Sequence, residues 1–70
     1  MRGNEFIKRV QRLAKDRGLS CLLDASRGKG SHVTLYFGAG LTVVRNPKDE
    51  LKSGTLHAML KQLGISETDW

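Results

Sequence analysis

Residues 32–45, reading His-Val-Thr-Leu-Tyr-Phe-Gly-Ala-Gly-Leu-Thr-Val-Val-Arg, carry the pattern that establishes the fold of this chain. Along residues 32–37 successive side chains point to opposite faces, so His32, Thr34 and Tyr36 share one face. Val33, Leu35 and Phe37 share the other and are expected to pack on the helices, while the first face meets water. Residues 38–40 predict a hairpin turn, and residues 41–45 predict the strand that follows it.

Helical periodicity flanks this hairpin on both sides. Apolar side chains recur every three or four positions along residues 4–17 and again along residues 54–63. Asn4 is predicted to cap the first helix, and Gly18 and Gly64 are predicted to end the two helices. The predicted buried stripes are Phe6, Ile7, Val10, Leu13 and Ala14 in the first helix and Leu56, Met59, Leu60 and Leu63 in the second.

A short apolar run at residues 19–25 predicts one more strand ahead of the hairpin. The expected fold is therefore α+β with the order α-β-β-β-α, in which both helices cover one face of a three-stranded antiparallel sheet. Seventy residues predict one domain, residues 1–70. Leu51 is expected to anchor the polar connector, and the C-terminal residues predict a short turn in which Trp70 packs on Ile65 or on a partner.

The charge is asymmetric, since the chain carries +5 overall and residues 1–29 hold eight basic against three acidic side chains. A basic field of this kind attracts polyanions, above all nucleic acid, although a solubilising surface is the alternative. The single cysteine, Cys21, fits a reducing cytoplasm and is interpreted as a small hydrophobe rather than a nucleophile. Neither a signal peptide nor a membrane span is predicted.

The basic, glycine-containing segment at residues 26–31 leads directly into His32. It does not match a Walker A or dinucleotide-binding pattern, and no spacing predicts a metal site, so no cofactor or metal is expected. RNA supplies its own nucleophile, because its 2′-hydroxyl can attack the neighbouring phosphate once a base removes the proton. The predicted catalytic residue is His32, and the predicted RNA-binding residues are Arg27, Gly28, Lys29, Gly30, Ser31 and Tyr36.

In this interpretation Arg27, Lys29 and the loop amides stabilise phosphate charge, and Tyr36 stacks on a base or orients the phosphate. The alternative for His32 is an exposed strand residue without a role. The second histidine, His57, is interpreted as a half-exposed residue on the face of the second helix.

Three stretches together resemble the HicA (YcfA-like) toxins: Glu-Phe-Ile-Lys-Arg-Val at residues 5–10, Gly-Ser-His at 30–32, and Glu-Leu-Lys-Ser-Gly-Thr-Leu at 50–56 with Leu-Lys-Gln-Leu-Gly at 60–64. The resemblance implies a double-stranded-RNA-binding-domain-like fold and ribosome-independent mRNA interferase activity. It also implies neutralisation by a HicB-type antitoxin, and it places the family's catalytic histidine on His32. The segment between the first predicted strand and the Gly-Ser-His motif, residues 24–29, is longer and more basic than the corresponding segment typical of the family.

Two other functions are compatible with the same residues. One is a non-catalytic RNA-binding module in which the loop only grips phosphates. The other is a pure interaction module whose apolar sheet edge pairs with a partner, for which no salt-dependent affinity for RNA is expected.

Overall fold

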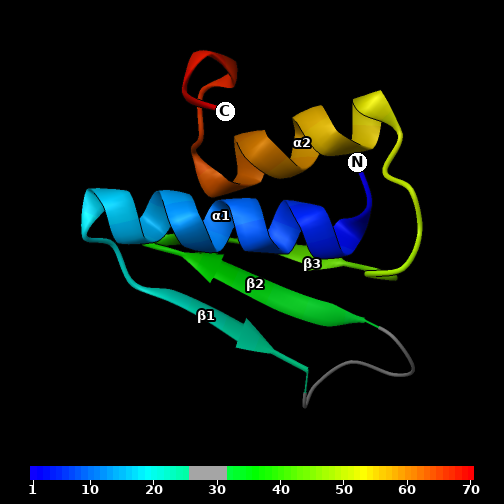
Figure 1. The fold of residues 1–70 in the computed structure, drawn as a ribbon, viewed down its shortest axis with the longest axis horizontal. Coiled ribbons are helices and arrows are strands. Elements are labelled where there is room, and N and C mark those ends of the chain that lie inside the picture. Colours follow the sequence, from blue (N-terminus) through cyan, green and yellow to red (C-terminus); the bar gives the residue numbers. More distant parts are fainter. Residues whose placement is uncertain (26–31) are drawn as a thin grey trace.

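The computed structural model describes residues 1–25 and 32–70, and its elements follow the predicted order (Figure 1). Three antiparallel strands form one sheet in the order β1-β2-β3, so β2 is central and β1 and β3 are edges. The predicted α+β, α-β-β-β-α fold is thereby confirmed. The elements are α1 (Gly3–Arg17), β1 (Cys21–Asp24), β2 (Val33–Phe37), β3 (Gly40–Val44), α2 (Ser53–Leu63) and the 3-10 turn η1 (Glu67–Asp69).

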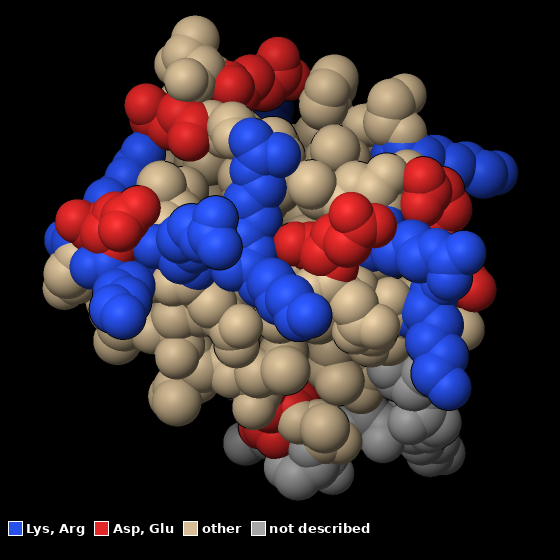
Figure 2. All heavy atoms as spheres, viewed as in Figure 1, with Lys and Arg blue, Asp and Glu red and all other residues tan. Residues whose placement is uncertain are grey.

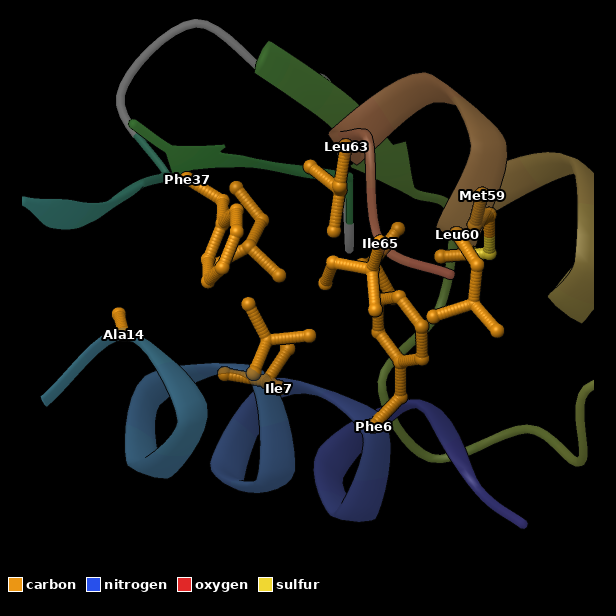
Figure 3. Close-up of a cluster of buried hydrophobic side chains, with 11 residues drawn as sticks. Phe6, Ile7, Ala14, Phe37, Met59, Leu60, Leu63 and Ile65 are labelled. Carbon is orange, nitrogen blue, oxygen red and sulfur yellow. The ribbon is translucent and has the colours of Figure 1, made fainter. Parts of the chain in front are cut away.

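The core lies between one face of the sheet and the two helices. α1 contacts β1 and β2, whereas α2 contacts β3. Leu35 is fully buried and Phe37 nearly so, as the alternation along β2 predicts. Figure 3 shows apolar side chains from both helices meeting in this layer. The buried hydrophobic residues are Phe6, Ile7, Val10, Ala14, Leu35, Phe37, Val44, Met59, Leu60, Leu63 and Ile65.

The two ends of α1 show one wrong prediction and one confirmed one. Asn4 is not the N-cap, because the helix starts one residue earlier at Gly3 and Arg2 holds the cap position. The Arg2 amide donates to the Glu5 carboxylate at 3.0 Å, and the Asn4 amide is already taken by the carbonyl of Pro47 at 2.7 Å. Gly18 ends the helix in the left-handed conformation (φ 67°), as predicted.

β1 and β2 are shorter than predicted, and β3 begins and ends one residue earlier than the predicted strand 41–45. Leu19 is not part of β1, since its amide donates to the carbonyl of Ala14 and so completes the end of α1. The hairpin turn holds only residues 38 and 39, and Gly40 therefore pairs with Phe37 and opens β3. Gly38 adopts φ 56°, the positive value that a two-residue hairpin turn needs at its first central position.

The C-terminal segment folds back over α1. Ser66 caps η1 by accepting from the Thr68 amide, and the Trp70 ring lies 5.3 Å from the ring of Phe6. The guanidinium of Arg9 sits 4.8 Å from the Trp70 ring centre and also donates to the Trp70 carbonyl. Trp70 thus extends the core through an aromatic contact with α1.

Candidate nucleic-acid interface

His32 lies at the end of the sheet, one residue before β2 begins, and its side chain is exposed. Alternation along β2 assigns it to the face of the sheet that the helices leave uncovered. Of the predicted RNA-binding residues, Arg27, Gly28, Lys29, Gly30 and Ser31 lie outside the described residues. The structure therefore presents His32 and Tyr36 from the predicted set.

Tyr36 stands in the middle of the uncovered face. It lies between Leu22 of β1 and Leu41 of β3 in the sheet register. Tyr36 is half-buried, whereas Leu22 is 67% exposed and Leu41 49% exposed. Two apolar side chains therefore flank the phenol, and this face offers a flat aromatic surface of the kind on which a base can stack.

Arg45 is a cation that sequence reasoning assigned only to a strand end. Val33 pairs with Val44, and this register continued by one residue places His32 opposite Arg45. Both side chains are exposed. The predicted turn over residues 38–40 would pair residue 32 with residue 46, whereas the observed two-residue turn at 38 and 39 pairs it with residue 45. An imidazole and a guanidinium on neighbouring strand ends can act on one phosphate.

A second basic surface covers α1, where Figure 2 shows Lys and Arg side chains with acidic ones among them. Arg17 pairs with Asp69 at 3.0 Å, and Arg9 is held by Trp70. Lys8, Arg12 and Lys15 are exposed and form no ion pair with any other residue in the described ranges. These cations lie on the helical side of the molecule and are free to attract a polyanion.

In a comparison with protein families, residues 7–65 match the model described as the HicA toxin of bacterial toxin-antitoxin systems. The matched region runs from α1 to the buried Ile65 that follows α2, and it includes His32 and Arg45. The chain belongs to the HicA toxin family. No curated protein and no solved structure is significantly similar to this HicA toxin. Family membership makes the chain a toxin of a toxin–antitoxin system and implies an antitoxin partner.

The second histidine and the single cysteine of this HicA toxin have structural surroundings that explain them without a role in chemistry. The His57 side chain is 59% exposed on α2, as predicted for a residue on the helix face, and its Nδ1 lies 3.4 Å from the Glu67 carboxylate. Cys21 is a free, partly buried thiol that packs against the core, and burial raises its pKa. A raised pKa lowers the thiolate fraction, in agreement with its interpretation as a small hydrophobe. Within residues 1–25 and 32–70, neither helix has the length and apolar character needed to cross a bilayer.

Proposed function

We propose that this HicA toxin is an endoribonuclease that cleaves mRNA without a metal ion, and that His32 moves the proton at the scissile phosphate. The observation that carries the proposal is the exposed His32 at the end of the sheet, opposite Arg45, within a HicA family match. A buried imidazole could not reach a ribose, and the side chain is not buried.

The reaction needs few groups. The 2′-oxygen of RNA forms a bond to the adjacent phosphorus while the bond from phosphorus to the 5′-oxygen breaks. The proton of the 2′-hydroxyl must leave, and the departing 5′-oxygen must receive one. His32 serves as general base or general acid in this exchange, since an imidazole can both accept and donate a proton. The products are a 2′,3′-cyclic phosphate and a 5′-hydroxyl.

We assign the stabilisation of the phosphate charge to cations that are near His32 in the strand register or in the sequence. Arg45 supports the phosphate from the hairpin side. We assign Arg27 and Lys29 the same role from the segment before His32, where Gly28, Gly30 and Ser31 let backbone amides approach the phosphate. Tyr36 stacks on a base of the bound strand. The cations of α1 lie on another face, and their part is to attract RNA over longer distances.

We further propose that residues 1–70 form one toxin domain that acts in the cytoplasm and is held by a HicB-type antitoxin. The His32 side chain is exposed, and we propose that the bound antitoxin keeps RNA away from it. An acidic partner over a surface of net charge +5 both inhibits and stabilises the toxin.

The test is incubation of the purified toxin with a defined RNA in excess EDTA, followed by analysis of the product ends. We expect cleavage that yields 2′,3′-cyclic phosphate and 5′-hydroxyl termini. A substrate carrying one 2′-deoxy residue at the cleaved position should resist at that position only. Retarded RNA without cleavage would favour the non-catalytic RNA-binding module. Cleavage that requires a divalent cation, or that leaves a 5′-phosphate, would contradict the proposed chemistry.

A further inference from the structure

A groove of about 860 Å³ runs between β3 and α2, on the far side of the hairpin from β1. β3 is an edge strand, so one side of its backbone forms the floor of this groove. Small or polar side chains of α2 form the wall, where Thr55 and Ala58 are both exposed. The principal lining residues are Leu41, Val43, Thr55, Ala58, Met59 and Gln62.

The register shows which backbone groups face the groove. The Gly38 amide donates across to Ser20 at 2.8 Å, so the even-numbered residues of β2 bond to β1 and the odd-numbered ones to β3. In an antiparallel ladder the partners Gly40, Thr42 and Val44 then bond to β2. Leu41 and Val43 must direct their N–H and C=O groups outward, into the groove. Neither residue has another backbone partner among the described residues.

The outward N–H and C=O groups of Leu41 and Val43 are spaced to hydrogen-bond an extended polypeptide. Such a ligand would add a fourth strand to the sheet. The exposed side chains of Leu41 and Val43 lie on the uncovered face, 49% and 47% exposed. Every second side chain of an added strand would lie on the same face as Leu41 and Val43 and next to them. The incoming segment should therefore alternate, with apolar residues on this side.

The charges around the groove and of the whole chain favour an acidic segment as its ligand. The groove continues past Val43 toward Arg45 and Lys52, with Asp49 and Glu50 also at that end. Glu50 is already paired with the N-terminal ammonium at 2.8 Å. The whole chain carries +5, so a second copy is repelled and an acidic chain is attracted.

We infer that the antitoxin docks on this HicA toxin by strand addition: an extended acidic segment of the antitoxin pairs with the edge of β3 in the groove beside α2. The inference rests on the antitoxin partner that family membership implies, and not on the nuclease chemistry of His32. Arg45, which lies opposite His32, also lines this groove, so the docked segment would reach the edge of the proposed RNA site.

Amide hydrogen exchange tests the pairing directly, with the toxin alone and with the antitoxin encoded beside its gene. In the free toxin the Leu41 and Val43 amides should exchange fast, as should the Leu23 amide at the opposite sheet edge. In the complex, exchange at Leu41 and Val43 should slow at least about tenfold while Leu23 stays fast. Protection at Leu23 instead would overturn the inference. So would protection of Leu41 and Val43 in a dimer of the toxin alone.

Two variant pairs supply an independent check by affinity. Val43→Pro removes an outward N–H from β3, and Leu23→Pro removes the corresponding outward N–H from β1, so both spare the internal ladder. Ala58→Arg fills the groove, and His57→Arg adds the same group one residue along α2, outside the groove. We expect V43P and A58R to weaken antitoxin binding at least about tenfold and both controls to leave it unchanged. Equal affinity for all four variants would overturn the inference, whatever their activity on RNA.

Discussion

The two faces of the sheet differ in how far their side chains are buried. On the helix-covered face Leu35 and Val44 are fully buried, and Thr42 is only 2% exposed. On the other face Leu22, Leu41 and Val43 each expose close to half of their side chain or more. The same three strands therefore bury one face in the core that they form with the helices and leave the other face exposed.

The difference separates folding from function in this small protein. A chain of 70 residues has little core, so the covered face cannot accommodate polar chemistry without losing stability. His32, Tyr36 and Arg45 belong to the uncovered face or its end, and the side chains of His32 and Arg45 are exposed, so changing them disturbs little packing. Substitutions matched across the two faces should show this division.

The largest expected effect comes from matched leucines on the two faces. Leu35→Ala removes a fully buried side chain and should lower the free energy of unfolding by about 2–5 kcal/mol, enough to unfold much of the population. Leu41→Ala, at 49% exposure, should cost about 0.5 kcal/mol or less. Urea denaturation measures both. Equal losses would mean that the uncovered face is packed against something in the isolated protein.

Two glycines near helix starts provide the next comparison. A Cβ on Gly3 would lie 2.7 Å from the Pro47 Cα, whereas a Cβ on Gly54 would meet open space. Gly3→Ala should therefore destabilise the protein by about 1–3 kcal/mol, because backbone must move. Gly54→Ala should stabilise it by up to about 1 kcal/mol through helix propensity. Thermal unfolding distinguishes the two signs, and a stable G3A variant would contradict the close approach of α1 to the connector.

Threonines give a smaller effect. Thr42 on the covered face donates its hydroxyl to the Gln62 side-chain oxygen at 2.5 Å. Thr42→Val loses this bond and should cost about 0.5–1.5 kcal/mol. Thr34→Val, on the uncovered face, should change stability by about 0.5 kcal/mol or less in either direction. If T34V proved the costlier variant in urea denaturation, the assignment of the two faces would be wrong.

Replacement of Cys21 should have the smallest effect, with no change in the rate of RNA cleavage. Burial raises the pKa of its thiol, so alkylation by iodoacetamide at neutral pH should be slower in the folded toxin than in urea. Cys21→Ala should cleave RNA at the parent rate in the assay described above. Rapid alkylation of the folded protein together with loss of cleavage would give the thiol a role that the structure does not support.

Most of the fold could be predicted because most of its elements are determined by residues close together in the sequence. The alternation along β2, the Gly38 turn and the helix ends at Gly18 and Gly64 each follow from one or two residues. The N-terminus of α1 could not be predicted, since its start depends on the Asp49 and Pro47 carbonyls, which are distant in sequence. The same holds for the contact of Trp70 with Phe6.

The candidate site was predictable only in part. The basic segment before the strand pointed to His32, the family motif falls on the same residue, and its exposure agrees with the proposed role. Arg45 was missed because a strand-end cation carries no motif, and its position opposite His32 emerges only from the hairpin register. The sequence predicted an apolar sheet edge that pairs with a partner as one alternative, but not that this edge is β3, because which backbone groups remain unpaired depends on the strand pairing and is not shown by the side-chain pattern.

The most direct test of the central claim is to measure RNA cleavage and unfolding together for His32→Ala, with His57→Ala as the matched control. We predict that H32A lowers the cleavage rate at least about a hundredfold while its free energy of unfolding stays within about 0.5 kcal/mol of the parent, and that H57A cleaves normally. Cleavage by H32A at the parent rate, or a loss explained entirely by unfolding, would contradict the assignment of this imidazole to the reaction.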